Sequence, residues 1–375
     1  MAATHRLIWM CPELTLYQQV LFRALARCPD VSLRVEIMTP RSPSHPFPQA
    51  EQLPYELGVA DQRRRVDRRL IDRVLSEKHA DVVVSSYMLP TLRSAMKALA
   101  GNRRRFLYWS DTPLPRGIQW NREFPAKRSF LRETVRNRFL KWIYRHAYRV
   151  LMTGHPGVMA SVYLGCPPSK TVSFPYWVAV DPDRRPPAQD ENRRHVVGLG
   201  QLIHRKGYDL ALDAFAKAVN ERIPEDVRLV LAGAGAAQAQ LQREADTLGI
   251  ADRVDFPGWL DDDGKRELFA TAGAFIHPAR WEPYGVVVLE AMEAGVAVLG
   301  SDQTMAVLDR ITDGVSGLIH ETGNINQLAR HLCQVYADGD GLRRMGESAR
   351  RTAEAWPPER SVEIIRDLLW DGAEK

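Results

Sequence analysis

The sequence predicts an α/β protein with two domains, each built on a parallel sheet that helices cover on both faces. A chain of 375 residues exceeds the roughly 250–300 residues over which one hydrophobic core usually grows. Short apolar runs alternate with amphipathic segments, which is the pattern of parallel strands joined by crossover helices. A proline-rich, charged stretch interrupts this alternation, which then restarts. We therefore expect a first domain over 1–178, a linker over 179–194, a second domain over 195–355 and a terminal helix within 356–375.

The first half supplies one predicted sheet and its helices. Strands are expected at 7–11, 32–38, 81–86, 105–110, 149–153 and 171–174. Helices are expected at 15–27, 61–78, 90–100, 128–147 and 157–164. The Pro- and Ser-rich residues 39–60 show no period, so we expect a loop there.

The second half repeats the same alternation after the linker. Strands are expected at 195–200, 228–232, 254–256, 274–277, 296–300 and 317–320. Helices separate these strands, and a last helix at 359–370 follows the sequence Trp356-Pro357-Pro358. Apolar strands at this spacing indicate a parallel sheet that is buried on both faces.

The bulk composition limits the cellular context. No apolar run approaches the ~20 residues that a membrane-spanning helix needs. The first residues lead directly into an apolar strand and leave no room for a signal peptide, so we expect a cytoplasmic protein. The four cysteines are scattered without metal or redox spacing.

Charge is distributed unevenly between the two halves. Residues 1–178 hold 28 basic and 13 acidic residues, a net charge of +15, whereas the remainder of the chain carries a net charge of −10. A basic half suits an anionic membrane surface, a phosphorylated substrate or nucleic acid. The two halves are therefore expected to have different partners.

The first candidate constellation is the segment from Val196 to Asp209. A strand ends in glycines that include Gly200, and Arg205-Lys206-Gly207 opens the next helix. A cation at this place can reach a phosphate, and one charge-assisted contact contributes roughly 1.5–3 kcal/mol. A dinucleotide fingerprint is excluded because its third glycine is missing. A solvated basic loop is the alternative.

The second constellation is a pair of glutamates, Glu282 and Glu290, eight positions apart. A turn at Pro283-Tyr284-Gly285 and then an apolar helix separate them, so Glu282 should lie on a loop and Glu290 about one turn inside the helix. The backbone N–H groups of Tyr284, Gly285 and Val286 open this helix and suit oxygen-rich or anionic groups. Carboxylates accept from sugar hydroxyls, so together with the basic loop they describe a site for a nucleotide-diphosphate sugar.

Both constellations, in this order, resemble the family-4 retaining glycosyltransferases, which have the GT-B fold. The resemblance covers the second half and includes 198–209, 229–235, 256–259, 277–278, the pair Glu282 and Glu290, 295–302 and 313–318. It implies two Rossmann-like domains that face a cleft and a C-terminal helix that crosses back to the first domain.

The resemblance also implies roles for individual residues. The donor would be a UDP- or GDP-linked sugar, bound without a cofactor or a metal ion. Glu282 would be catalytic, next to the reacting carbon. The diphosphate would be bound by Gly200, Arg205 and Lys206, and the ribose by Glu290. The sugar and phosphate would contact the backbone of Tyr284, Gly285 and Val286. The base would lie beside the turn at Gly258 and Leu260.

Acceptor binding would fall to the first domain. Asp111 and Glu13 are expected on the acceptor side, and the acceptor would be a glycan or a lipid-linked glycan. Family members transfer a hexose with retention of configuration. The implied reaction is a front-face displacement in which the departing diphosphate takes the acceptor proton.

The sequence departs from the family pattern at three places. Gln201 stands where members often carry Arg, 11–16 replaces a Gly-rich loop, and Trp109-Ser110-Asp111 keeps the aspartate of a common His-Asp pair without its histidine. No catalytic histidine is therefore assigned. Two alternatives stay open: a GT-B enzyme with a soluble small-molecule or sugar-phosphate acceptor, and a non-catalytic binder of nucleotide sugars or glycans.

The predicted helix at 128–147 is the third constellation. Between Lys127 and Arg149 the chain has eight basic residues and one acid, Glu133, around an apolar stripe. One hypothesis is a solvated face on an ordinary core helix. The other is a surface that lies on anionic lipid at the inner face of the plasma membrane and admits a lipid-linked acceptor. No nucleic-acid motif accompanies the charge, so nucleic acid is not expected as a partner.

Overall fold

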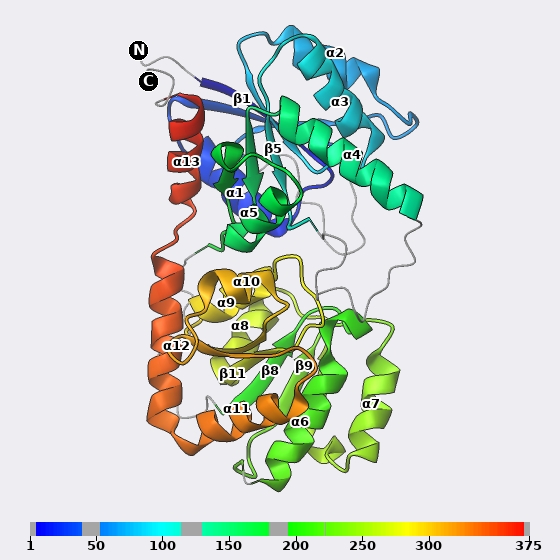
Figure 1. Ribbon diagram of the computed structural model, residues 1–375. Coiled ribbons are helices and arrows are strands. Elements are labelled where there is room, and N and C mark those ends of the chain that lie inside the picture. Colours follow the sequence, from blue (N-terminus) through cyan, green and yellow to red (C-terminus); the bar gives the residue numbers. More distant parts are fainter. Residues whose placement is uncertain (1–4, 40–52, 114–129, 180–193, 222, 371–375) are drawn as a thin grey trace. The chain divides into compact units, whose positions relative to one another are not determined.

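The chain divides into two units, each with its own parallel sheet (Figure 1). The computed structural model describes residues 5–39, 53–113, 130–179, 194–221 and 223–370. Among these residues, the first unit runs to Trp177 and takes in the C-terminal segment from Pro358. The second unit spans Val178–Pro357. Most of the linker expected at 179–194 lies outside the described residues.

The first unit is a seven-stranded sheet in the order β3-β2-β1-β4-β5-β6-β7, with every pair parallel. Its strands are β1 His5–Cys11, β2 Val31–Ile37, β3 Glu56–Val59, β4 Asp81–Ser85, β5 Leu107–Ser110, β6 Arg149–Met152 and β7 Thr171–Ser173. Its helices are α1 Leu16–Ala26, α2 Arg68–Ser76, α3 Pro90–Gly101, α4 Phe130–His146, α5 Gly154–Tyr163 and α13 Glu359–Leu369. The strand order changes direction at β1, which lies between β2 and β4.

Strand β3 corrects the expectation of a loop over 39–60. Glu56–Val59 pairs with β2 at the edge of the sheet, in the register Glu36 to Gly58. The strand is only four residues long and includes a glycine, so it carries no alternation that a pattern could detect. A Cβ at position 58 would lie 2.0 Å from the buried carboxylate of Glu36, so any larger residue would have to displace that side chain.

Helix α2 is shorter than the expected helix at 61–78. The Asp67 side chain accepts a hydrogen bond from Leu70 N at 3.1 Å and starts the helix at Arg68. Aspartate is a favoured N-cap residue. The basic residues before Asp67 therefore belong to a turn, not to the helix.

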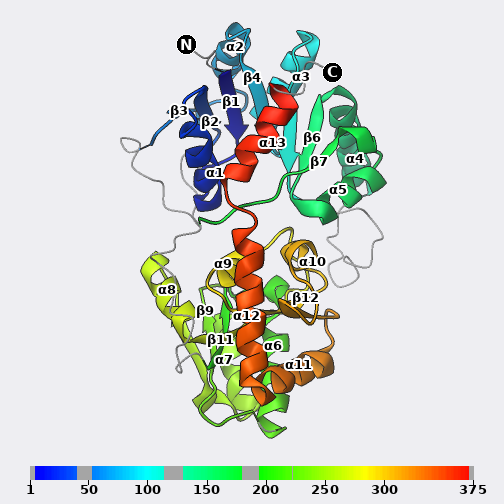
Figure 2. The same ribbon diagram turned by 90° about the vertical axis from the view of Figure 1, so that its left-hand side faces the viewer.

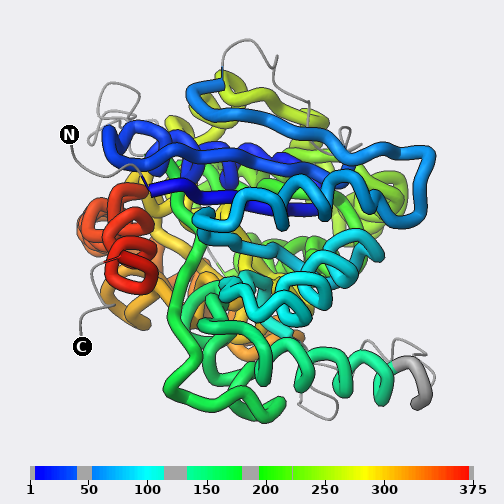
Figure 3. The backbone as a smooth tube through the Cα atoms, turned by 90° about the horizontal axis from the view of Figure 1, so that it is seen from above, coloured from blue at the N-terminus to red at the C-terminus, as the bar shows by residue number. Residues whose placement is uncertain are grey.

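Helix α13 completes the core of the first unit, as the C-terminal crossover predicted. It lies beside α1 (Figure 2, Figure 3) and buries Val362, Ile365 and Leu369 in the cluster around Trp9. Arg366 pairs with Asp30, and Trp370 Nε1 donates to Asp81 Oδ2 at 3.0 Å. Residues from both ends of the sequence therefore share one core.

The second unit is a six-stranded parallel sheet in the order β10-β9-β8-β11-β12-β13. Its strands are β8 His195–Leu199, β9 Leu229–Ala232, β10 Val254–Gly258, β11 Ala272–His277, β12 Ala297–Ser301 and β13 Gly317–His320. Its helices are α6 Tyr208–Asn220, α7 Gln238–Thr247, α8 Asp262–Thr271, α9 Val286–Glu293, α10 Met305–Arg310, α11 Ile325–Ala337 and α12 Gly339–Glu354. All six strands predicted for this half are present.

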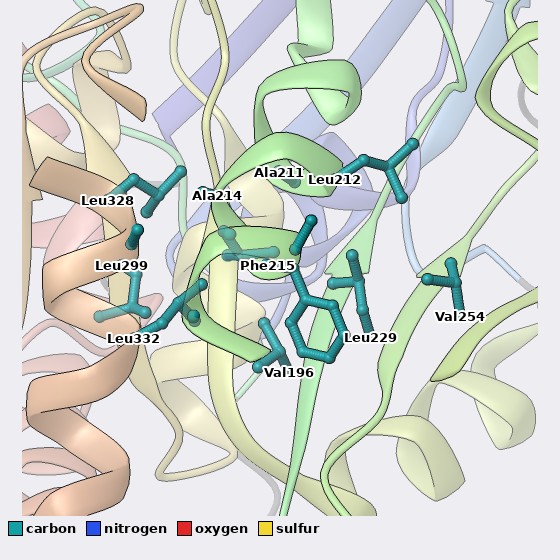
Figure 4. Close-up of a cluster of buried hydrophobic side chains, with 14 of the residues drawn as sticks. Val196, Ala211, Leu212, Ala214, Phe215, Leu229, Val254, Leu299, Leu328 and Leu332 are labelled. Carbon is teal, nitrogen blue, oxygen red and sulfur yellow. The ribbon is translucent and has the colours of Figure 1, made fainter. Parts of the chain in front are cut away.

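The hydrophobic core of this unit is centred on helix α6. Phe215 projects from α6 toward Val196 and Leu229 on the sheet, and Leu332 comes from α11 (Figure 4). The strand order reverses at β8, which lies between β9 and β11, so the loops after β8 and β11 flank a topological switch point. Open α/β sheets bind ligands at such points. No described helix is long and apolar enough to span a bilayer.

Candidate functional site

The loop after β8 carries the predicted phosphate-binding cations. His204–Lys206 forms one short 3-10 turn that ends at Gly207, whose φ is +70°. A Cβ on Gly207 would lie 2.1 Å from Pro278 O, so only glycine lets this loop contact the segment after β11. Two chain segments more than 70 positions apart therefore meet here.

Arg280 ties the two segments together. Its backbone N–H donates to Arg205 O at 2.9 Å, and its guanidinium donates to His204 O at 2.9 Å. The same guanidinium pairs with Asp209, in the first turn of α6, at 2.6 and 2.5 Å. Burial raises the pKa of Asp209, but the pair with Arg280 outweighs burial, and the pKa falls below its usual value. The bidentate geometry fixes both partners.

Glu282 forms ion pairs with both cations of the basic loop. Lys206 Nζ lies 2.5 Å and Arg205 Nη1 lies 2.9 Å from Glu282 Oε2, and Arg205 Nη1 also donates to Trp281 O at 2.9 Å. Lys206 is 9% exposed and Glu282 is 7% exposed. Burial alone would raise the pKa of Glu282, but Lys206 and Arg205 outweigh it and lower the pKa. The carboxylate is therefore ionised and held by two cations.

The Glu282 loop is fixed on its other side by α10. Glu282 N donates to Gln303 O at 2.9 Å, and Ala306 N donates to Tyr284 O at 2.7 Å. The buried side chain of Tyr284 donates to Asp309 Oδ2 at 3.0 Å. Tyr284 thus anchors the loop through its hydroxyl, and only its backbone is left for a ligand.

Gly285 lies next to Glu282, and Gly200 lies next to Lys206. Gly285 has a φ of +98° and starts α9 at Val286, so Glu290 lies inside that helix as predicted. Gly200 has a φ of +148°, and a Cβ there would lie 3.7 Å from Lys206 Nζ. Gly200 therefore borders the charged group of Lys206.

Glu290 has a partner that the sequence did not suggest. Its Oε1 lies 3.3 Å from Lys265 Nζ, and Lys265 also pairs with Asp262 at 2.8 Å. Burial lowers the pKa of Lys265, but Glu290 and Asp262 outweigh burial and raise it, so Lys265 is charged. A lysine on a solvated helix looks the same in sequence, and no pattern could have identified this contact.

The predicted base-side turn follows β10. Gly258 has a φ of +83°, and its carbonyl accepts from Gly233 N at 2.7 Å. Leu260 packs near Gly264, where a Cβ would meet its side chain at 3.2 Å. Between them Trp259 is 66% exposed, although it carried no separate prediction. An exposed indole beside a ligand loop can stack on a ring.

The two residues predicted on the acceptor side lie in the first unit, at the carboxyl ends of β5 and β1. Asp111 Oδ1 accepts from Tyr176 at 2.8 Å, and the ring of Tyr176 lies 4.4 Å from that of Tyr17. Burial, with the nearby carboxylates of Asp111 and Glu13, raises the pKa of Tyr17. Asp111 and Glu13 therefore both lie near Tyr17. Among all described residues, no group of three or more His, Cys, Asp or Glu is placed to hold a metal ion.

The second unit is similar in sequence to a known family. Residues 180–352 match the family described as "Glycosyl transferases group 1". This part of the chain is therefore similar to the group 1 glycosyltransferases. It contains each predicted donor-site residue of the second unit, from Gly200 to Glu290.

Curated relatives match over less than half of their own length. The lipopolysaccharide core biosynthesis glycosyltransferase LpsE of Rhizobium meliloti is 32% identical over 157 residues, which cover 42% of this chain and 44% of LpsE. The mannosylfructose-phosphate synthase of Agrobacterium fabrum is 36% identical over 108 residues, which cover 27% of this chain and 23% of that protein. The two names describe different products.

Solved structures match over the whole chain. Anabaena HepE, crystallised in complex with UDP, superposes with a TM-score of 0.75 at 17% identity and covers 97% of this chain and 100% of HepE. At this identity the likeness establishes the fold, which is GT-B as the sequence predicted.

Proposed function

We propose that this chain is a retaining glycosyltransferase that moves a hexose from a UDP- or GDP-linked sugar to a glycan or a lipid-linked glycan. The observation that carries the proposal is the meeting of Arg205, Lys206 and Glu282 on the loops after β8 and β11, with Glu290 eight positions further on. These loops flank the switch point of the sheet, where α/β folds bind ligands. The UDP in the HepE structure supports a nucleotide in this site.

The proposed reaction is a displacement on one face of the sugar. The acceptor hydroxyl oxygen forms a bond to C1 as the bond between C1 and the diphosphate oxygen breaks. The electron pair of the broken bond stays on the diphosphate, which also takes the hydroxyl proton. Arg205 and Lys206 stabilise the departing charge, and the N–H groups at the start of α9 add to them.

The two glutamates divide the remaining work. Glu282 bears a negative charge beside C1, where positive charge develops as the leaving group departs. Glu290 accepts hydrogen bonds from the ribose hydroxyls, and the ion pair with Lys265 orients it. The proposal needs no cofactor and no metal ion, because the basic side chains supply the positive charge.

A donor panel tests this proposal. We expect turnover with a UDP- or GDP-linked hexose and an α-linked product from an α-linked donor, measured by NMR of the anomeric proton. Glu282→Ala should abolish turnover while nucleotide binding remains. Turnover unchanged in Glu282→Ala would remove Glu282 from the reacting centre. Nucleotide binding without turnover by the wild type with every donor and acceptor would favour the non-catalytic binder.

The relatives support two acceptor classes. LpsE is named for lipopolysaccharide core biosynthesis, which favours a lipid-linked glycan, whereas the mannosylfructose-phosphate synthase favours a soluble sugar phosphate as the second candidate. A panel that contains hexose phosphates and detergent-solubilised glycolipids separates the two. Product formed only with hexose phosphates would establish the second candidate.

A cytoplasmic enzyme with a lipid-linked acceptor would work at the inner face of the plasma membrane, and we place this contact at α4 and α5. Val135 on α4 and Met159 and Tyr163 on α5 are exposed apolar side chains, and Lys141 and Arg145 on α4 are exposed cations. Basic groups attract anionic lipid, and apolar groups insert at the interface. We expect co-sedimentation with phosphatidylglycerol vesicles at low salt and not with phosphatidylcholine vesicles. Lys141→Glu with Arg145→Glu should abolish it.

A further inference from the structure

His277, the last residue of β11, is fully buried. Neither of its ring nitrogens has a hydrogen-bond partner among the described residues. Burial and the nearby Lys206 lower the pKa of His277 to about 3, so its ring is neutral at physiological pH and carries one N–H donor. Leaving a buried donor unpaired is unfavourable, and folded proteins normally avoid it. Hydrogen bonds to the described residues therefore do not explain why a histidine is buried at this position.

The ring lies directly behind the Glu282 loop. Nε2 of His277 is 4.0 Å from Glu282 Oε2. A Cβ built on Gly285 would lie 3.6 Å from the same Nε2 and 3.1 Å from Glu282 Cγ. The charged and titratable groups that act on the ring are Lys206, Glu282, Arg205 and His320. The carboxylate that the reaction would use therefore lies 4.0 Å from a ring nitrogen of His277.

In the structure, Glu282 Oε2 does not depend on this donor. It already accepts from Lys206 and Arg205. A bound diphosphate would attract the same two cations, because phosphate oxygens are strong acceptors of charge-assisted hydrogen bonds. Each cation that turns to the diphosphate removes a donor from Glu282, and a nearly buried carboxylate without donors is costly.

We propose that His277 is a positioning residue whose Nε2–H donates to Glu282 when the donor diphosphate draws Lys206 and Arg205 away. This inference rests on the proposed function, because it requires a diphosphate at the two cations. A shift of about 1 Å would bring the 4.0 Å separation to a hydrogen-bond distance. A neutral donor orients Glu282 without neutralising it, so the carboxylate keeps its charge beside C1.

Three variants test the proposal by kinetics. His277→Leu should lower kcat about 10- to 100-fold, the range for losing one hydrogen bond to a charged group, with the donor KM changed less than about threefold. His277→Gln places an amide N–H near the position of Nε2 and should restore kcat to within about fivefold of the wild type. His320→Leu is the matched control, since His320 is a buried histidine at the end of β13, which β12 separates from β11.

These kinetics separate positioning from packing. If His277→Leu and His277→Gln lose kcat equally, or if His277→Leu matches His320→Leu, His277 only fills space and the proposal is overturned. A rise in donor KM with unchanged kcat would also overturn it, because that result describes ground-state binding.

An NMR titration supplies a readout that does not depend on turnover. Protein with ¹⁵N-labelled histidine is titrated with UDP, GDP and inorganic pyrophosphate, while calorimetry reports binding. We expect the Nε2–H proton of His277 to move downfield on binding, as it enters a hydrogen bond with Glu282. If the nucleotides bind and this signal stays in place, the inference falls and the proposed function stands. If none of the three binds, the proposed function falls, and the inference falls with it.

Discussion

At the scale of single residues, the candidate site is organised by the ion pair between Lys206 and Glu282. Both side chains are nearly buried, and a buried charge is tolerated only when it is paired. Arg205 adds a second cation to the same carboxylate oxygen. Under the proposed function, a donor diphosphate would compete with Glu282 for the two cations, and the site would exchange one anionic partner for another on binding.

Replacing Lys206 by alanine should weaken nucleotide binding. The loss of one charge-assisted contact corresponds to a decrease in UDP or GDP affinity of about 10- to 100-fold, measured by calorimetry. Lys217→Ala is the control, because Lys217 is an exposed lysine of α6 that contacts Asn326. Equal affinities for Lys206→Ala and the wild type would show that this cation does not hold the diphosphate.

At the scale of elements, one glycine brings the basic loop against the loop after β11. Gly207 has a left-handed backbone and no room for a Cβ next to Pro278. Gly249 offers a matched comparison, since its φ of +69° is nearly that of Gly207 at +70° and no atom lies within 4 Å of its Cβ position. Comparing substitutions at the two positions separates the effect of backbone strain from the effect of losing the contact with Pro278.

Gly207→Ala should therefore destabilise the protein more than Gly249→Ala. Left-handed backbone disfavours a side chain by about 1–2 kcal/mol, which is the whole effect expected at Gly249. At Gly207 the clash with Pro278 adds to the strain and separates Arg205 from Glu282. Urea unfolding measures the free-energy difference, and UDP affinity should fall only for Gly207→Ala. Equal effects of the two substitutions on both measurements would contradict this account.

The pair of Asp209 and Arg280 predicts a pH dependence. The folded-state pKa of Asp209 lies below its usual value, so the pair stabilises the fold above about pH 4, where the carboxyl is ionised in the unfolded chain as well. This stabilisation is lost as the pH falls through the lower, folded-state pKa. Asp209→Asn should thus be less stable than the wild type at pH 7, and the difference should shrink below pH ~4. Thermal unfolding across this range measures it, and a difference that stays constant with pH would refute it.

The elements of the second unit could be predicted because their signals are local. Short apolar runs mark most of its strands, and the Pro283-to-Gly285 turn marks the start of α9. Contacts between distant loops carry no such signal. The sequence placed Lys206 and Glu282 in one site as contacts for a donor, and it did not predict that they contact each other. Lys265 beside Glu290 and the unpaired ring of His277 were missed for the same reason.

At the scale of the whole molecule, the C-terminal segment of the chain belongs to the first unit. Residues 358–370 follow the second unit in sequence. They form α13, which packs into the core of the first unit together with β1 and α1. The resemblance to GT-B proteins predicted this return, whereas hydrophobic periodicity predicted only a helix. The strand β3 escaped prediction because a short edge strand buries too little to show a pattern.

Ile365→Ala tests whether α13 is a structural part of the first unit. Ile365 is fully buried against the Trp9 cluster, so its truncation should destabilise the protein by about 2–5 kcal/mol. Glu363→Ala, an exposed position of the same helix, should change the free energy of unfolding by less than about 0.5 kcal/mol. UDP affinity should stay within about twofold of the wild type below the unfolding transition, because Lys206 and Glu282 lie in the second unit. A fall in affinity as large as the fall in stability would show that α13 also supports the nucleotide site.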